Sequence, residues 1–120
     1  MKVAVTSQGP EGTSPIDTRF GRAKWIVVVD TDTGEIQAHD NKVNLTLAQG
    51  AGIQTGQNVA NLDADAVITG NLGPNAYKTL ATAEVKVFLS SGETVEQVVA
   101  AFKQGELREV QKANVEGHWM

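Results

Sequence analysis

Short apolar runs rich in β-branched residues recur along the chain, and polar segments containing glycine separate them. Runs of this length, bounded by turn-forming residues, are typical of strands. Before one of them, Asp32-Thr33-Gly34 predicts a hairpin turn in which Gly34 takes the left-handed conformation. The next strand carries Ile36 and Ala38 on one face. The strands predicted in this way are Lys2–Thr6, Trp25–Asp30, Glu35–Asp40, Asp65–Thr69 and Val85–Leu89.

Three helices are predicted between and after these strands, over about Ile53–Leu62, over Pro74–Thr82 and after Thr94. Proline suits the first position of a helix, because its missing N–H would have no partner there. Thr94 and Gln97 have the spacing of a capping box, and Gly105 is placed to end the third helix. The apolar face of that helix consists of Val95, Val98, Val99 and Phe102.

This order of elements predicts an α/β domain over residues 1–105 with a five-stranded mixed sheet, whose second strand is antiparallel, and three helices. Residues 106–120 are charged and weakly patterned, and we expect them to form a mobile or partner-seeking tail outside the core. In such a sheet the first, third, fourth and fifth strands end at one edge. The loops that leave this edge are 7–24, 41–52, 70–73 and 90–93.

Composition excludes several classes of function. The chain has 120 residues, a net charge of −4 and no cysteine, so it is no disulfide scaffold, thiolate zinc protein or cysteine-ligated iron–sulfur protein. Aromatic residues make up only 5%, and no basic patch interleaved with aromatics points to nucleic acid. There is no apolar run of the roughly 20 residues that a membrane span requires. Met1–Val5 lacks the features of a signal peptide, and we expect a soluble cytoplasmic protein.

Eight of the 12 glycines lie in the four loops at the predicted edge. Ligands of open α/β sheets bind beyond the carboxyl ends of the strands, where helix N-termini offer free N–H groups to anions. The clustering of these glycines therefore favours an anion site, although any one of them alone is better explained as an ordinary turn residue with a positive φ. They are Gly9, Gly12, Gly21, Gly50, Gly52, Gly70, Gly73 and Gly92.

Three basic residues, Arg19, Arg22 and Lys24, lie near the end of the first of these loops. Beside helix N-termini they suit contact with an anion, and the alternative is a solvated loop that only adds solubility. His39 and His118 lie in no metal-ligand spacing and are weak candidates for metal ligands. Surface histidines without a ligand are the more common case.

Catalytic and nucleotide-binding motifs are absent from the sequence. Gly50–Gly56 fails the G-x-G-x-x-G spacing because Thr55 stands at the third glycine position, and there is no P-loop or G-x-S-x-G elbow. Ribonuclease H-like nucleases share this strand order and carry metal-binding carboxylates on the first strand and at the end of the fourth. Val3–Thr6 and Ile68–Gly70 contain no carboxylate, which argues against a two-metal nuclease. We therefore expect binding without catalysis.

Three motifs resemble the dinitrogenase iron–molybdenum cofactor-binding family: Arg19-Phe20-Gly21-Arg22-Ala23, Gly50-Ala51-Gly52-Ile53-Gln54 and the segment from Asp65 to Ala76. The resemblance covers nearly all of residues 1–105. It implies a ribonuclease H-like α/β fold and noncovalent binding of an anionic metal–sulfur cluster. Members often have histidine where this chain has Arg19, which removes a metal ligand and adds a cation.

The resemblance implies a carrier for a molybdenum-containing sulfide cluster, either of the iron–molybdenum cofactor type or a molybdenum–copper sulfide as in the orange-protein subtype of sulfate reducers. Since the chain has no cysteine, the cluster would have to supply its own sulfur. A protein partner would receive the cluster or respond to it. The residues expected to contact the cluster are Arg19, Phe20, Gly21, Arg22, Lys24, Gly50, Gly52, Ile53, Gln54, Gly70, Asn71, Gly73, Asn75 and Gly92.

Two other functions fit the same sequence. In the first, a metal-free regulatory or scaffold protein acts through protein contacts of the domain surface and of residues 106–120, with Trp119 as an anchor. In the second, the helix N-termini bind a small phosphorylated ligand instead of a cluster.

Overall fold

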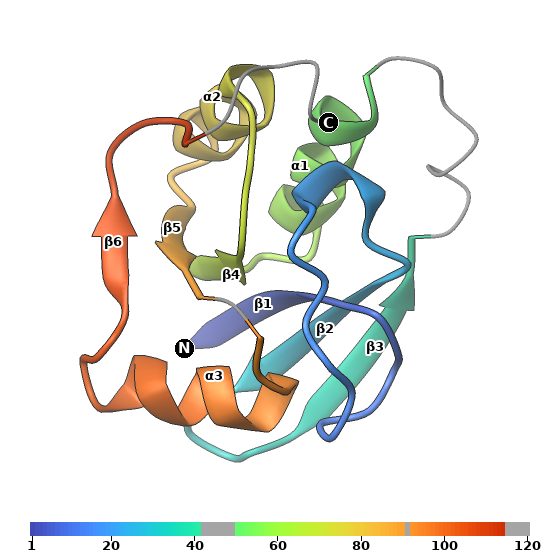
Figure 1. Cartoon of the computed structure of the whole chain (residues 1–120), viewed down its shortest axis with the longest axis vertical. Helices are drawn as coiled ribbons and strands as arrows, with labels where there is room; N and C mark the ends of the chain where they lie inside the picture. Colours follow the sequence, from blue (N-terminus) through green and yellow to red (C-terminus); the bar gives the residue numbers. More distant parts are fainter. Residues whose placement is uncertain (42–49, 91, 115–120) are drawn as a thin grey trace.

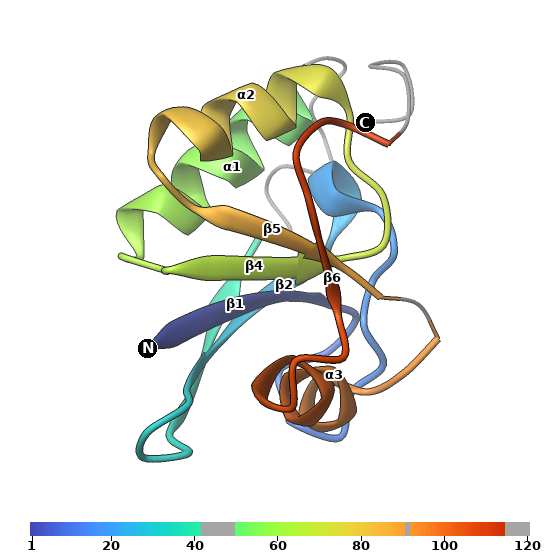
Figure 2. The same ribbon diagram turned by 90° about the vertical axis from the view of Figure 1, so that its left-hand side faces the viewer.

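The computed structural model of the chain describes residues 1–41, 50–90 and 92–114. Its sheet lies between two helical layers, with α1 and α2 on one face and α3 on the other (Figure 1, Figure 2). The elements in chain order are β1 (Lys2–Ser7), the 3₁₀ turn η1 (Phe20–Arg22), β2 (Trp25–Asp30), β3 (Ile36–Asp40), α1 (Ala51–Asn61), β4 (Ala66–Thr69), α2 (Pro74–Thr82), β5 (Lys86–Leu89), α3 (Val95–Lys103) and β6 (Arg108–Val110).

The sheet has the strand order β3-β2-β1-β4-β5-β6. β1, β4 and β5 run parallel, whereas β2 is antiparallel to both of its neighbours, as the sequence predicts. All five predicted strands are confirmed, but the sheet has six strands and not five. The sixth, β6, lies within the segment predicted to be a tail outside the core and pairs antiparallel with β5. It is short and mostly exposed, so it forms because β5 offers an open edge and not because of its own sequence pattern.

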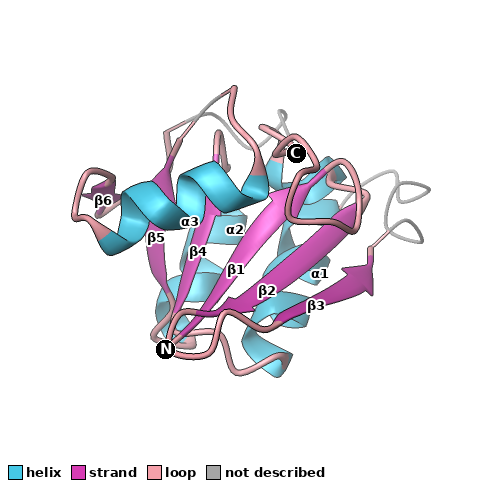
Figure 3. Cartoon of the chain, turned by 90° about the horizontal axis from the view of Figure 1, so that it is seen from below, coloured by secondary structure: helices cyan, strands magenta, loops and turns pink. Residues whose placement is uncertain are grey.

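Alternation along the strands divides the core between the two faces of the sheet. In β1, Ala4 faces α1 and α2, while Val3 and Val5 face α3. In β2, Val28 faces α1 and α2, while Val27 faces α3. Figure 3 shows α3 lying across the strands on the face opposite α1 and α2. None of the helices in the described ranges has the length and apolarity to cross a membrane.

Local signals set the ends of most elements. Pro74 occupies the first turn of α2, which ends at Thr82 as predicted. The capping box of α3 is present, with Thr94 Oγ1 accepting from the Gln97 N–H at 3.3 Å and Gln97 Oε1 accepting from the Thr94 N–H at 3.0 Å. Gly34 and Gly105 have φ of 79° and 74°, which confirms their predicted left-handed conformations. α1 begins at Ala51, two residues before the predicted start at Ile53.

Candidate functional site

The loops predicted to share an edge do so. β1, β3, β4 and β5 point the same way, because β3 is antiparallel to β2 and β2 to β1. In Figure 2 the chain leaves β1, β4 and β5 on the right-hand side, where η1 and the start of α2 also lie. This is the carboxyl edge of the sheet, at which α/β proteins bind ligands.

The first and third loops join directly at this edge through Asn71. The Phe20 N–H donates to Asn71 O at 3.1 Å, and Asn71 Nδ2 donates to Thr18 O at 3.2 Å. A Cβ added to Gly70 would lie 2.8 Å from Thr18 Cα and 2.9 Å from Thr18 O. Gly70 is therefore required for the close approach of two backbones, and the Asn71 side chain fastens two loops together.

η1 is anchored by Phe20, whose side chain is fully buried among residues of α1 and α2 such as Val59 and Ala76. Gly21 is buried beside it. The sequence places Phe20 among the residues that contact a ligand, but its side chain belongs to the core. Its effect on the edge is to anchor η1, which contains Arg22 and directly follows Arg19, on α1.

The cations of the first loop remain at the surface. The Arg19 side chain is 60% exposed, and its Nε lies 4.0 Å from Oδ1 of the nearly buried Asp17. The same Oδ1 accepts from the Arg19 N–H at 3.0 Å, so the backbone here is held while the guanidinium stays accessible. Arg22 is half-buried and Lys24 is exposed. Asp17 has no motif in the sequence that would reveal this role.

Asn41, which is fully buried, ties the end of β3 to the first loop and to α1. Its Nδ2 donates to Ala23 O at 2.8 Å and to Thr55 Oγ1 at 3.1 Å. Its Oδ1 accepts from Asn58 Nδ2 at 3.1 Å. Sequence analysis misses Asn41, because nothing in its local pattern distinguishes it from an exposed loop residue. The remainder of the second loop, residues 42–49, lies outside the described residues.

α1 and α2 both begin without a side-chain cap. Gly50, with φ of 78°, precedes α1, and Gly73 precedes α2. The first N–H groups of a helix have no acceptor within the helix, and no described residue outside the helices accepts from those of α1 and α2, so these two starts present donors and the positive end of the dipole. Ile53 in the first turn of α1 is 37% exposed. The Gln54 side chain, a predicted contact, instead donates to Asn58 Oδ1 at 3.1 Å.

The start of α3 is different, because the first loop closes it. The Val95 N–H donates to Ser14 O at 3.0 Å, and the Glu96 N–H donates to Gly12 O at 2.9 Å. With the capping box, these bonds use the first three amides of the helix. The expectation that all three helices offer free donors is therefore wrong for α3. Gly92, just before it, has φ of 77° and open space around its Cβ position.

Asn114 completes the third loop from the segment predicted to be a free tail. Its Oδ1 accepts from the Leu72 N–H at 2.8 Å. Its Nδ2 donates to Gly70 O at 3.2 Å and to Asn71 Oδ1 at 3.1 Å. The Asn114 N–H donates to Leu72 O at 3.3 Å. Asn114 is, after Asp17 and Asn41, the third residue that sequence analysis misses, and no spacing in the chain connects it to residues so far away.

His39 and His118 are the two weak candidates for metal ligands. No group of three or more histidine, cysteine, aspartate or glutamate side chains suited to a metal ion occurs in the described ranges. His39 lies half-buried on the edge strand β3, level with Ile26 of β2, and His118 lies outside the described residues. Asn75 is exposed in the first turn of α2.

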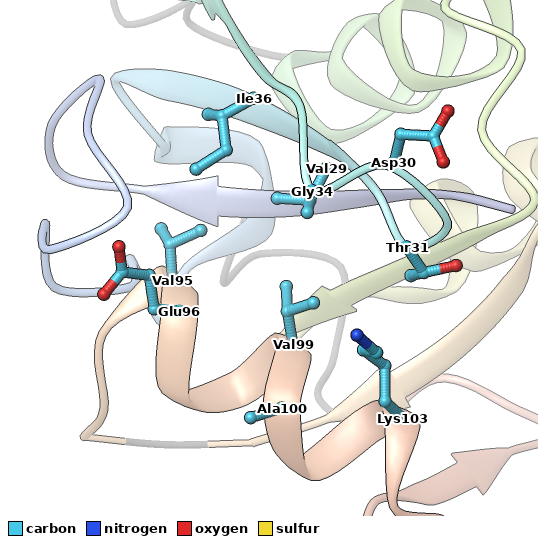
Figure 4. A pocket seen from close by; sticks show the side chains of 10 residues that line it. All are labelled: Val29, Asp30, Thr31, Gly34, Ile36, Val95, Glu96, Val99, Ala100 and Lys103. Atoms are coloured by element: carbon cyan, nitrogen blue, oxygen red, sulfur yellow. The ribbon is translucent and has the colours of Figure 1, made fainter.

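A groove of about 240 Å³ lies elsewhere, between the β2–β3 hairpin and α3 (Figure 4). Val29, Ile36 and Val99 give it an apolar wall, while Glu96 and Lys103 carry opposite charges. This lining does not suit an anionic cluster. Among the described residues, cations and uncapped helix starts occur together at the carboxyl edge, in a chain without thiols.

Comparison with known proteins confirms the resemblance. A sequence model of the family described as dinitrogenase iron-molybdenum cofactor matches residues 1–105. The apo form of the orange protein from Desulfovibrio gigas is 38% identical, with a TM-score of 0.93 over 95% of this chain and 96% of that one. A Thermotoga protein of the DUF35 family, solved by NMR, is 33% identical, with a TM-score of 0.83 over 97% and 98% of the two chains.

An uncharacterized protein of Methanocaldococcus jannaschii is 25% identical over 109 residues, which is 89% of each chain. The family match spans most of the sequence, so the chain belongs to the dinitrogenase iron–molybdenum cofactor family.

Proposed function

We propose that this member of the family is a non-catalytic carrier that binds an anionic molybdenum-containing metal–sulfur cluster at the carboxyl edge of its sheet. The family match and the similarity to the orange protein support a role in holding a metal cluster. We further propose a ribonuclease H-like classification for the fold and cytoplasmic localisation, as the sequence predicts.

One observation carries the proposal: exposed Arg19, whose backbone pairs with Asn71 in the loop that leads into α2, lies at the sheet edge where two helices begin without a side-chain cap, in a chain with no cysteine. A cluster held by such a site brings its own sulfides, and these accept hydrogen bonds and attract cations. We assign charge neutralisation to Arg19, Arg22 and Lys24. Hydrogen-bond donation falls to backbone amides at the starts of α1 and α2.

Most of the other predicted contacts divide into two groups. Gly50 and Gly92 are exposed and would let the cluster approach the backbone, because they carry no side chain, whereas Gly52 and Gly73 are buried and would act within the helix starts. Phe20, Gly21, Gly70 and Asn71 would act indirectly, by holding the loops in place. Both a molybdenum–copper sulfide and an iron–molybdenum cofactor fit this donor set. The similarity to the orange protein favours the first.

Reconstitution tests the proposal. The purified protein is mixed with tetrathiomolybdate and copper, or in parallel with iron–molybdenum cofactor, then desalted and examined by absorption and elemental analysis. We expect one arm to give a coloured protein, and Arg19→Ala with Arg22→Ala to bind at least tenfold more weakly. Lys103→Ala removes an exposed cation from the hairpin groove and should bind like wild type. A wild-type protein that stays colourless and metal-free in both arms would refute the proposal.

The alternative function, a metal-free regulatory protein acting through residues 106–120, gains no support from the described part of that segment. β6 pairs with β5, and Asn114 bonds to the third loop, so these residues are engaged within the molecule. Elemental analysis of protein isolated from its native source separates the two functions.

A further inference from the structure

Asn114 makes four hydrogen bonds to three consecutive residues of the third loop, although 42 positions separate it from Leu72. It lies beyond residue 105, where the match to the family model ends. Its amide uses both of its functions at once, because Oδ1 accepts from the Leu72 N–H while Nδ2 donates to Gly70 O and Asn71 Oδ1. Among neutral side chains, only those of asparagine and glutamine combine an acceptor oxygen with two N–H donors in one planar group.

The loop that Asn114 holds leads directly into α2. Leu72 precedes Gly73, the residue before the helix, and Pro74 has no N–H, so the first free donors of α2 are the amides of Asn75 and Ala76. On its other side the loop is fastened to Thr18 and Phe20 through Asn71. The direction of the α2 amides relative to Arg19 therefore depends on a loop held from both sides.

We infer that Asn114 is a positioning residue for the anion site: from outside the family-matched region, it fixes Gly70–Leu72 and thereby the direction of the free amides of α2. The inference rests on the proposed function, and it adds that the C-terminal segment forms part of the binding apparatus. The Leu72 amide itself is occupied by Asn114 Oδ1 and is not a ligand contact.

Two variants test this role. Asn114→Ala removes the side-chain acceptor and donors. Asn114→Asp keeps an acceptor for the Leu72 N–H but turns a carboxylate oxygen toward Gly70 O and Asn71 Oδ1, where two acceptors would repel it. We expect tetrathiomolybdate–copper to bind about tenfold more weakly to Asn114→Ala, and at least as weakly to Asn114→Asp, since each variant loses the bonds that hold the loop.

Two controls separate positioning from general destabilisation. Gln111→Ala alters an exposed side chain of the same segment that contacts Glu109. Val110→Ala loosens the packing of β6 while leaving every bond of Asn114 in place. Both should bind the probe as wild type does, even where Val110→Ala lowers the unfolding free energy as much as Asn114→Ala.

Amide hydrogen exchange in the protein without the probe gives an independent measurement. The Leu72 amide should exchange faster in Asn114→Ala than in wild type, and unchanged exchange would overturn the inference whatever the binding result. Equal or tighter binding by Asn114→Ala would also overturn it, since tighter binding would make Asn114 a competitor of the ligand. A wild-type protein that binds neither cluster refutes the proposed function, and with it the inference. The inference fails by itself, with the proposed function intact, only where the wild-type protein binds a cluster and one of the contradicting results for Asn114→Ala is found.

Discussion

The starts of α2 and α3 lie at the same edge of one sheet, yet only one of them is open. Each follows a parallel strand, and each carries the positive end of a helix dipole. At α3 the carbonyls of Gly12 and Ser14 and the Thr94 hydroxyl accept from the first amides. At α2 a glycine precedes the helix and no side chain caps it. Whether a helix start can bind an anion is therefore decided by the chain around it, because the dipole is common to both.

Replacement of Phe20, on the side of the open helix start, should lower the stability of the protein most. Phe20→Ala removes a fully buried ring that anchors η1 on the open side of the edge, and large-to-small core changes of this kind cost about 3–5 kcal/mol. Urea unfolding measures the loss. Phe102→Ala, the same change at a half-buried ring of α3 that packs edge-on against Phe88 of β5, should cost clearly less. Equal losses would show that η1 is not anchored as described.

An added methyl group at Gly70 should have the next largest effect. Gly70→Ala forces the third loop away from the Thr18 backbone, and overpacking typically costs about 1–3 kcal/mol. The methyl group added in Gly92→Ala has no atom within 4 Å. The variant should therefore lose only the stability that a left-handed alanine costs, about 1 kcal/mol. We expect Gly70→Ala to impair cluster loading more than Gly92→Ala does. The opposite ranking would contradict the described junction between the first and third loops.

Removal of the α3 cap should lower stability without creating a second anion site. Thr94→Ala loses the bond to the Gln97 N–H, which is worth about 1 kcal/mol. The amides of Val95 and Glu96 keep their backbone acceptors, so α3 stays closed. Thermal unfolding should shift down while the amount of cluster bound stays at the wild-type value. Increased loading in this variant would mean that capping alone distinguishes the two helix starts.

The smallest effect is expected at the opposite edge of the sheet. There the amino group of Met1 donates to Asp32 Oδ2 at 3.0 Å, and this hydrogen bond raises the pKa of the amino group. The stabilisation is therefore fully present below the unfolded pKa of about 8 and is lost as the pH rises through the raised folded value. Both groups are exposed, so thermal unfolding should change only slightly above pH 8. Asp32→Asn should remove this pH dependence, and cluster loading at fixed pH should stay the same.

Much of this comparison can be predicted from local sequence. Thr94 with Gln97 predicts the capping box of α3, Pro74 predicts the first turn of α2, and the strand pattern brings the loops to one edge. The closure of α3 is not predicted, because free donors are expected at all three helices. What cannot be predicted are contacts between distant segments. The acceptors Gly12 and Ser14 reach α3 from far along the chain.

The same limit explains the errors at the candidate site. Phe20 occurs in a motif that suggests ligand contact, but burial against α1 and α2 makes it a core residue. β6 has no apolar alternation to reveal it, because an edge strand takes its hydrogen bonds from the neighbour and exposes most of its side chains. Asn41 and Asn114 each act through one side-chain amide. A single buried amide, or one that bonds to a distant segment, leaves no periodic pattern in the sequence.

The position of Asn114 near the C-terminus also has a consequence during synthesis. Ribosomes add about 5–20 residues per second, so Asn114 follows Leu72, 42 positions earlier, after about 2–8 seconds. For that interval the nascent chain can contain all of α1, β4 and α2 while its third loop is held from one side only. The last part of the edge to be made is thus the part that holds it, so the third loop is held from both sides only after Asn114 has been synthesised.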